Sequence, residues 1–208
     1  MKLRLLTTAA AVLALAAVSA CNQKEAENPG QTDAVNTAQD MAGAATGLAT
    51  GAAGAVNTDA FLRDAAIGDM YEIESSKLAL QRSKNAEIKR AAQVIIDDHT
   101  ASSAKLKAIA AQLGKTLPTE MDERRKGMMD NLRAASAEDF DDRYLDQQTA
   151  AHHEALTAFN GYREAGPDAP LKQFAAETAP RLETHAKLVT SLDRESGADD
   201  EAGATKKH

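Results

Sequence analysis

Apolar and small residues recur at steps of three and four in four long stretches of the chain, the spacing that places them on one face of an α-helix. The stretches are 58–83, 86–113, 136–164 and a last one from just after Asp168 to about Glu195. The clearest inward face is formed by Ile88, Ala92, Ile95, His99, Ser102, Leu106, Ile109 and Leu113. The pattern predicts four helices that pack through these faces.

Polar and helix-breaking residues mark where these helices begin and end. Asn85 is a suitable N-cap for the second helix, and Gly114 is a suitable C-terminal residue because it tolerates positive φ. Ser136 and Asp139 are expected to open the third helix, and Gly166-Pro167-Asp168 separates it from the fourth.

A shorter helical segment, Glu120 to Arg133, lies between the second and third long helices, with Thr119 and Asp122 as an expected capping pair. At about 1.5 Å per residue, this segment and its flanks carry the chain from one end of a bundle toward the other. The second and third long helices would then be parallel, as in a ferritin-like crossover. The predicted fold is therefore all-α, a ferritin-like four-helix bundle with a short crossover helix.

Length and composition are consistent with one helical domain at 58–195 and a disordered tail at 196–208. The chain has 208 residues, no Trp and few aromatic residues. It is also acidic, with a formal net charge of -7 that becomes -9 when Lys2 and Arg4 are removed with residues 1–20. An acidic surface that is poor in aromatic residues argues against nucleic acid as a partner.

The first residues have the pattern of an export signal: Lys2 and Arg4 precede an apolar run, Leu5 to Val18, that is too short to span a bilayer. Val18-Ser19-Ala20-Cys21 resembles the lipobox of bacterial lipoproteins. The alternative is ordinary cleavage after Ala20, with Cys21 left as a free thiol. The resemblance implies that residues 1–20 are removed and that Cys21, the only cysteine, is lipidated and anchors the protein in a membrane.

Residues 21–57 are predicted to be a flexible tether between this lipid anchor and the helical domain, because they contain no helical seam and no aliphatic cluster. Asn22 follows the cysteine, and in lipoproteins of Gram-negative bacteria this residue favours transfer to the outer membrane. The expected location is therefore the cell envelope, with the domain facing the periplasm.

Four ionisable residues fall on the inward seam, or its edge, of four different helices: Glu72, His99, His152 and His185. Each lies near the middle of its predicted helix, so the four side chains are expected to meet at one level of the core. His153 points about 100° away from His152 and is expected at the surface. A buried carboxylate or imidazole needs a partner, which makes this set the candidate site.

The run from Phe61 to Leu192 resembles the DUF4142 family. The residues that carry the resemblance are Gly68, Glu72-Ile73, Asp97-Asp98-His99, Leu117-Pro118, Phe140-Asp141, Tyr144, His152, Phe174-Ala175, Pro180, Leu182 and His185. The resemblance implies a ferritin-like fold, an envelope location and recurring polar positions at Glu72, Asp98, His99, His152 and His185. It implies no reaction, because the family has no established biochemical activity.

The four residues differ from a diiron carboxylate site, which needs more carboxylates and Glu-x-x-His on two helices. One Glu with three His suits a single Zn, Cu or Fe ion instead, with Asp98 as an acceptor that orients an imidazole. The alternative is a polar layer in which Glu72 accepts hydrogen bonds from the imidazoles and fixes the register of the helices. The protein would then be a non-enzymatic interaction or stress-related module.

Overall fold

The computed structural model describes residues 56–204, with side chains described to Arg194, and this part of the chain is helical without any strand. The long helices are α2 (Thr58–Arg82), α3 (Ala86–Gln112), α5 (Phe140–Ala165) and α6 (Ala169–Ala204), and α4 (Glu123–Ala134) is short. The predicted all-helical class is confirmed. The predicted signal peptide, the lipidation site at Cys21, most of the tether and residues 205–208 lie outside the described residues.

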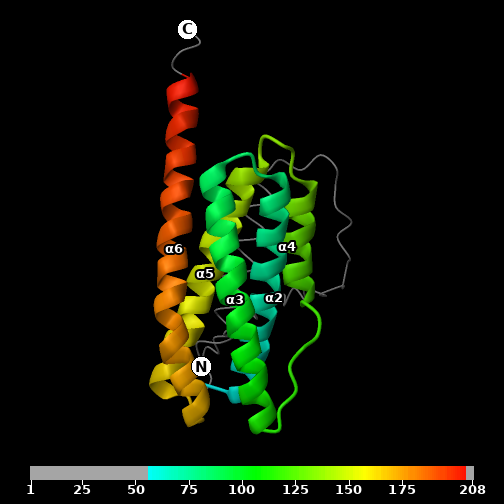
Figure 1. Cartoon of the computed structure of the whole chain (residues 1–208), viewed down its shortest axis with the longest axis vertical. Coiled ribbons are helices and arrows are strands. Elements are labelled where there is room, and N and C mark those ends of the chain that lie inside the picture. The colour runs from blue at the N-terminus through cyan, green and yellow to red at the C-terminus, as the bar shows by residue number, and fades with distance from the viewer. Residues whose placement is uncertain (1–55, 205–208) are drawn as a thin grey trace, which may run out of the picture. The chain divides into compact units, whose positions relative to one another are not determined.

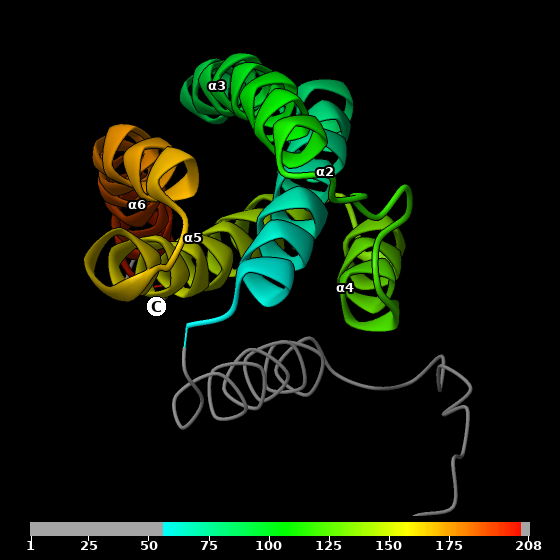
Figure 2. The same ribbon diagram turned by 90° about the horizontal axis from the view of Figure 1, so that it is seen from below.

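The four long helices surround one interior, because α2 packs on α3, α3 on α6, α6 on α5 and α5 on α2. Figure 2 shows this arrangement along the helices, with α4 lying outside, beside α2. In Figure 1 the chain ascends in α2, α4 and α6 and descends in α3 and α5. The helix α4 thus returns the chain to the end where α3 began, so α3 and α5 run in the same direction.

Two large apolar clusters fill the interior between the four long helices, and a smaller cluster includes Tyr71 of α2 and Met128 of α4. One large cluster contains Phe61, Leu106, Phe159 and Phe174 among its buried residues. The other large cluster contains Ile88, Ile95, Leu132, Phe140, Tyr144, Leu145, Val189 and Leu192 among its members. In each long helix most of the buried polar residues lie, along the sequence, between the segments that supply the two clusters, whereas Arg143 and Thr178 lie within those segments. A polar layer therefore separates two apolar halves of the core.

Local sequence signals explain the helix boundaries that were predicted well. The Asn57 and Asn85 side chains accept hydrogen bonds from backbone N–H groups in the first turns of α2 and α3, satisfying donors that would otherwise have no partner. Gly114 follows α3 with a φ of 67°, which confirms its expected left-handed conformation.

Three predicted boundaries were wrong. Asp122, not Thr119, caps α4 by accepting from the N–H of Arg125 at 2.8 Å, so α4 begins at Glu123. Ser136 accepts from the N–H groups of a turn over residues 137–139, and α5 begins only at Phe140. The backbone of α6 is helical to Ala204 and covers most of the stretch for which a disordered tail is predicted. Its apolar seam ends at Leu192, so the pattern contained no signal for the last turns.

No helix of the described part is long and apolar enough to cross a membrane.

Two glycines should respond to alanine with opposite signs, because one needs its conformational freedom and the other does not. In Gly114→Ala an alanine backbone must adopt a positive φ, and we expect the free energy of unfolding to fall by about 1 kcal/mol. Gly127 lies in the middle of α4, is exposed to solvent and has no neighbour that an added Cβ would touch. Gly127→Ala should therefore raise the free energy of unfolding by about 0.5–1 kcal/mol. Urea denaturation measures both, and a loss of stability in Gly127→Ala would contradict the expected helix-propensity gain.

Candidate metal centre

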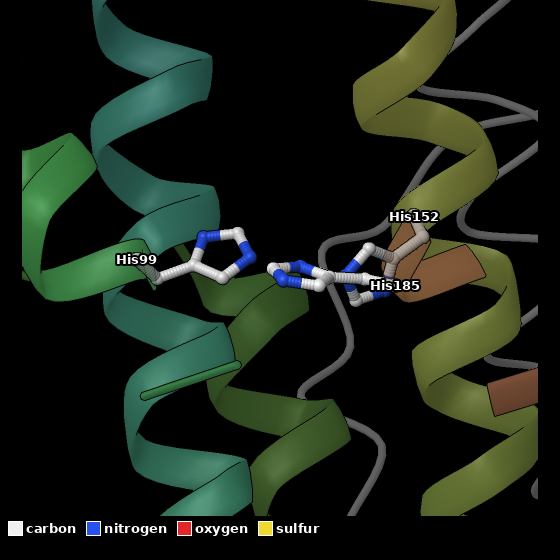
Figure 3. Close-up of side chains that lie close together, drawn as sticks. All are labelled: His99, His152 and His185. Atoms are coloured by element: carbon white, nitrogen blue, oxygen red, sulfur yellow. The ribbon is translucent and has the colours of Figure 1, made fainter. Parts of the chain in front are cut away.

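Three histidines from three helices meet in the polar layer: His99 of α3, His152 of α5 and His185 of α6. One ring nitrogen from each lies within 4.8 Å of those of the other two. The ring centroids are 5.3 to 5.8 Å apart, and all three residues are at least 95% buried. Figure 3 shows the three imidazoles turned toward one another. The predicted convergence of these histidines is therefore present.

A carboxylate orients the first imidazole. The Nδ1 atom of His99 lies 2.8 Å from Oδ1 of Asp69, and Ser103 donates a hydrogen bond to the other oxygen of the same carboxylate at 3.0 Å. Asp69 is itself buried. Because this carboxylate on α2 accepts the ring N–H of His99, it fixes both the tautomer and the direction of the ring.

A second carboxylate orients His185, and it is the one predicted from the sequence. The Nε2 atom of His185 lies 2.9 Å from Oδ2 of Asp98. The Arg181 guanidinium donates to Oδ1 of the same carboxylate at 2.5 Å. Partial burial opposes ionisation of Asp98, but the hydrogen bonds and charges of His185 and Arg181 outweigh it and lower its pKa.

The third imidazole is held by its own helix. The Nδ1 atom of His152 lies 2.9 Å from the backbone carbonyl of Gln148, one turn earlier in α5. Each of the three rings thus has one nitrogen engaged with a hydrogen-bond acceptor on the protein. This arrangement is the one that metal-bound histidines adopt, because the acceptor leaves the opposite nitrogen available as a ligand.

In the described part of the chain, the opposite nitrogens have no hydrogen-bond partner. They are Nε2 of His99, Nε2 of His152 and Nδ1 of His185, and all three atoms are buried. A polar layer that satisfied itself would pair these atoms, since an unsatisfied buried acceptor is costly. Three such atoms on rings that face one another are compatible with a bound metal ion.

Burial and neighbouring charges favour the neutral form of two of the rings. Burial, followed by repulsion from His99, lowers the pKa of His152 to about 3. Burial, with repulsion from His152 and His99, lowers the pKa of His185 to about 4. Burial also opposes protonation of His99, but the hydrogen bond and charge of Asp69 outweigh it and raise its pKa. Neutral imidazole is the form that binds metals.

Glu72 lies in the same layer but outside the three-histidine group. Burial raises the pKa of its carboxyl group, and the charges of His99 and Arg125 only partly oppose this shift. Its Oε2 atom is buried without a hydrogen-bond partner. Glu72 lines a cavity of about 910 Å³ between α2 and α5 together with His99 and His152.

Two residues of the site were missed in the sequence. Asp69 precedes Glu72 by three residues and so lies on the same side of α2, which was a usable signal that a second acid faced the interior. Gln148 precedes His152 by four residues and so lies on the same face of α5, but its contribution is a backbone carbonyl, for which the side chain gives no signal.

The three rings need only a modest closure to bind one ion. In a metal site with nitrogen ligands at about 2.0–2.1 Å, neighbouring nitrogens lie roughly 3.3–3.6 Å apart. A pair of nitrogens at the 4.8 Å limit in this structure would therefore have to approach by about 1.2–1.5 Å, which side-chain rotations can supply.

The chain belongs to the family described as a domain of unknown function (DUF4142), which matches residues 43–192. Among solved structures, the fold is similar to that of "CopM in the Cu(II)-bound form", with a TM-score of 0.58 and 17% sequence identity. The similarity covers 66% of this chain and 95% of that one. No curated protein matches the chain. At this identity the structural likeness concerns the fold alone.

The depressed pKa of His152 predicts that acid destabilises the metal-free protein. The unfolded chain takes up this proton near pH 6.5 and the folded chain only near pH 3, so stability is lost as pH falls through this window. Between pH 7 and pH 5 we expect this group to remove roughly 1–2 kcal/mol of stability. Denaturation in the presence of a chelator should therefore show a weaker acid dependence for His152→Gln than for wild type.

His153→Gln is the matched control, because His153 is the exposed neighbour on the same helix. An equal change of the acid dependence in both variants would show that the buried imidazole is not its source.

Proposed function

We propose that this protein binds a single copper ion through His99, His152 and His185. The observation that carries the proposal is the set of three buried ring nitrogens without partners, on imidazoles that face one another and are each anchored through the other nitrogen. The competing interpretation, a layer that serves only stability or an interaction module, does not account for three unsatisfied acceptors at one point.

Copper is favoured over zinc and iron by two considerations. Imidazole is a good ligand for all three metals, and copper(II) forms the most stable complexes of the divalent first-row ions with a given set of nitrogen ligands. The structure with a similar fold carries copper(II) according to its name. Both considerations support copper, and the metal content of the purified protein decides among Zn, Cu and Fe.

Glu72 is proposed as a fourth ligand, and Asp98 and Asp69 as the groups that orient two of the imidazoles. The Oε2 atom of Glu72 is buried and unpartnered beside the cluster, and a positive ion would favour its ionised form. Because Glu72 lies outside the group of ligand atoms within 4.8 Å of one another, its side chain has to move toward the ion.

We assign the finer architecture as a ferritin-like four-helix bundle with α4 as the crossover. The packing of α2, α3, α5 and α6 around one interior and the parallel directions of α3 and α5 support this assignment. The site differs from ferritin-like diiron centres because it has one nearby Glu and three His. Such a donor set suits holding or transferring one ion, so we propose a binding role for the protein.

We further propose that the protein acts in the cell envelope, anchored through lipid on Cys21. The sequence Val18-Ser19-Ala20-Cys21 and the apolar run before it support this location. The 36 residues between Cys21 and Thr58 would let the domain reach away from the lipid surface.

Metal content tests the copper proposal directly. Protein released from the envelope without an affinity tag should contain about one equivalent of copper or regain it from copper(II), and bound copper should raise the melting temperature. His99→Ala, His152→Ala and His185→Ala should each weaken copper binding by at least about tenfold. Competition with a chromophoric chelator measures the affinities.

His153→Ala is the control for these variants, because its imidazole is exposed on the same helix as His152. Copper affinity that is unchanged in the three buried-site variants, or lost equally in His153→Ala, would place any bound copper elsewhere and contradict the proposal.

The lipid anchor is tested by Cys21→Ala. With no acceptor for the lipid, the variant should be absent from the membrane fraction, whereas wild type should sediment with membranes and incorporate labelled fatty acid. Membrane association of Cys21→Ala equal to that of wild type would show that the protein is held by other means.

A further inference from the structure

The three-histidine cluster faces two cavities of different character. The cavity between α2 and α5 touches His99 and His152, and its walls are more apolar than polar, although charged side chains such as Asp69, Glu72 and Arg125 also line it. A pocket of about 330 Å³ between α3 and α6 touches His99 and His185. The walls of this second pocket include four charged side chains, Asp98 and Lys105 of α3 and Glu177 and Arg181 of α6. A hydrated cation crosses polar walls at lower cost than apolar ones.

Asp98 connects the outside of the α3–α6 pocket to the cluster. Its two oxygens point to different partners, because Oδ2 accepts from His185 at 2.9 Å and Oδ1 accepts from Arg181 at 2.5 Å. The Asp98 side chain is 28% exposed and that of Arg181 is 58% exposed, whereas His185 is 99% buried. The contacts therefore form a line from solvent through Arg181 and Asp98 to one of the proposed ligands.

We propose that the metal ion enters and leaves between α3 and α6, and that the Arg181–Asp98 ion pair controls the rate of this exchange. The inference rests on the copper-binding function proposed above. With the pair closed, the guanidinium places a positive charge at the mouth of the pocket and occupies the outer oxygen of Asp98. With the pair open, that oxygen faces the incoming cation and is free to act as its first ligand.

The ion pair has the properties that a gate requires. Within the described part of the chain, the ion pair of Arg181 is with Asp98 and not with a proposed ligand, so its opening leaves the ligands of the bound ion in place. An ion pair with a half-exposed guanidinium is held weakly, since solvent screens it, and it can open without disturbing the core. The inner oxygen of Asp98 meanwhile keeps its contact with His185, so the ligand stays oriented whether the gate is open or closed.

Arg181→Met removes the gate, and Lys105→Met is its matched control. Lys105 lines the same pocket and carries the same charge, but its partner is Glu177, at 3.7 Å, rather than Asp98. Stopped-flow mixing of the full chain with copper(II) at low ionic strength gives the rate of uptake, and transfer to excess chelator gives the rate of release. For Arg181→Met we expect both rates to rise about three- to tenfold, with an equilibrium affinity within about threefold of wild type.

Two bulky variants identify the route itself. Ala101 lines the α3–α6 pocket and Ala155 lines the α2–α5 cavity, and an alanine side chain makes no hydrogen bond to a ring nitrogen that its replacement could break. Ala101→Phe should slow uptake and release together, while Ala155→Phe should leave both rates near those of wild type. The equilibrium affinity of each variant, measured in parallel, reports whether the site itself is intact.

The outcomes separate the two proposals. Wild-type protein that fails to bind copper overturns both the function and the gate. Copper binding with unchanged rates in Arg181→Met, or with the same acceleration in Lys105→Met, retains the function and overturns the gate. Slower exchange in Ala155→Phe but not in Ala101→Phe places the route between α2 and α5 and also overturns this inference.

Discussion

The desolvation of a few polar groups is the constraint on which this structure depends. Two apolar clusters fill the ends of the helical interior, and buried ionisable side chains lie between them. Burying an imidazole or a carboxylate is costly unless a partner replaces the lost water. Much of the layer meets this demand with short, directed contacts such as Asp69 to His99, Ser76 to Tyr144 and Tyr71 to Gln147. Among the described residues, buried side-chain atoms without a hydrogen-bond partner occur at several positions, and three of them are nitrogens of the facing rings.

The same constraint gives the helices their register. Apolar side chains such as Leu, Ile and Ala can exchange neighbours at little cost, so the two clusters alone allow the helices to slide by one turn. A slide of α3 against α2 would separate His99 from Asp69, and a slide of α6 against α3 would separate His185 from Asp98. Each displacement would leave a buried imidazole without its carboxylate partner. The polar contacts therefore select one alignment among several that the apolar residues permit.

The sequence predicted much of this arrangement, because helical periodicity is a strong signal over long segments. The seams of the long helices placed His99, His152 and His185 correctly on the interior, and Asp98 was expected to orient an imidazole without indication of which one. The boundaries near Thr119, Ser136 and Glu195 were predicted less well, because Ser, Thr and Asp all cap helices and an exposed helix end leaves no apolar pattern. Periodicity also indicated which side of each helix faces the interior, but it gave no distances between side chains. It could not show that Glu72 stands outside the cluster or that Asp69 holds His99.

The descent of α3 and α5 in the same direction, set by the return of the chain through α4, has a consequence for unfolding. His99 and His152 are 53 residues apart in the chain, and His185 follows 33 residues later, so an ion shared by the three acts as a removable cross-link that closes two long loops. Such closure restricts the unfolded chain much as a disulfide does. The cross-link joins α3, α5 and α6 directly, and Glu72, as the proposed fourth ligand, would add α2. The loaded protein would thus resist denaturation with a strength set by the free concentration of a single ion.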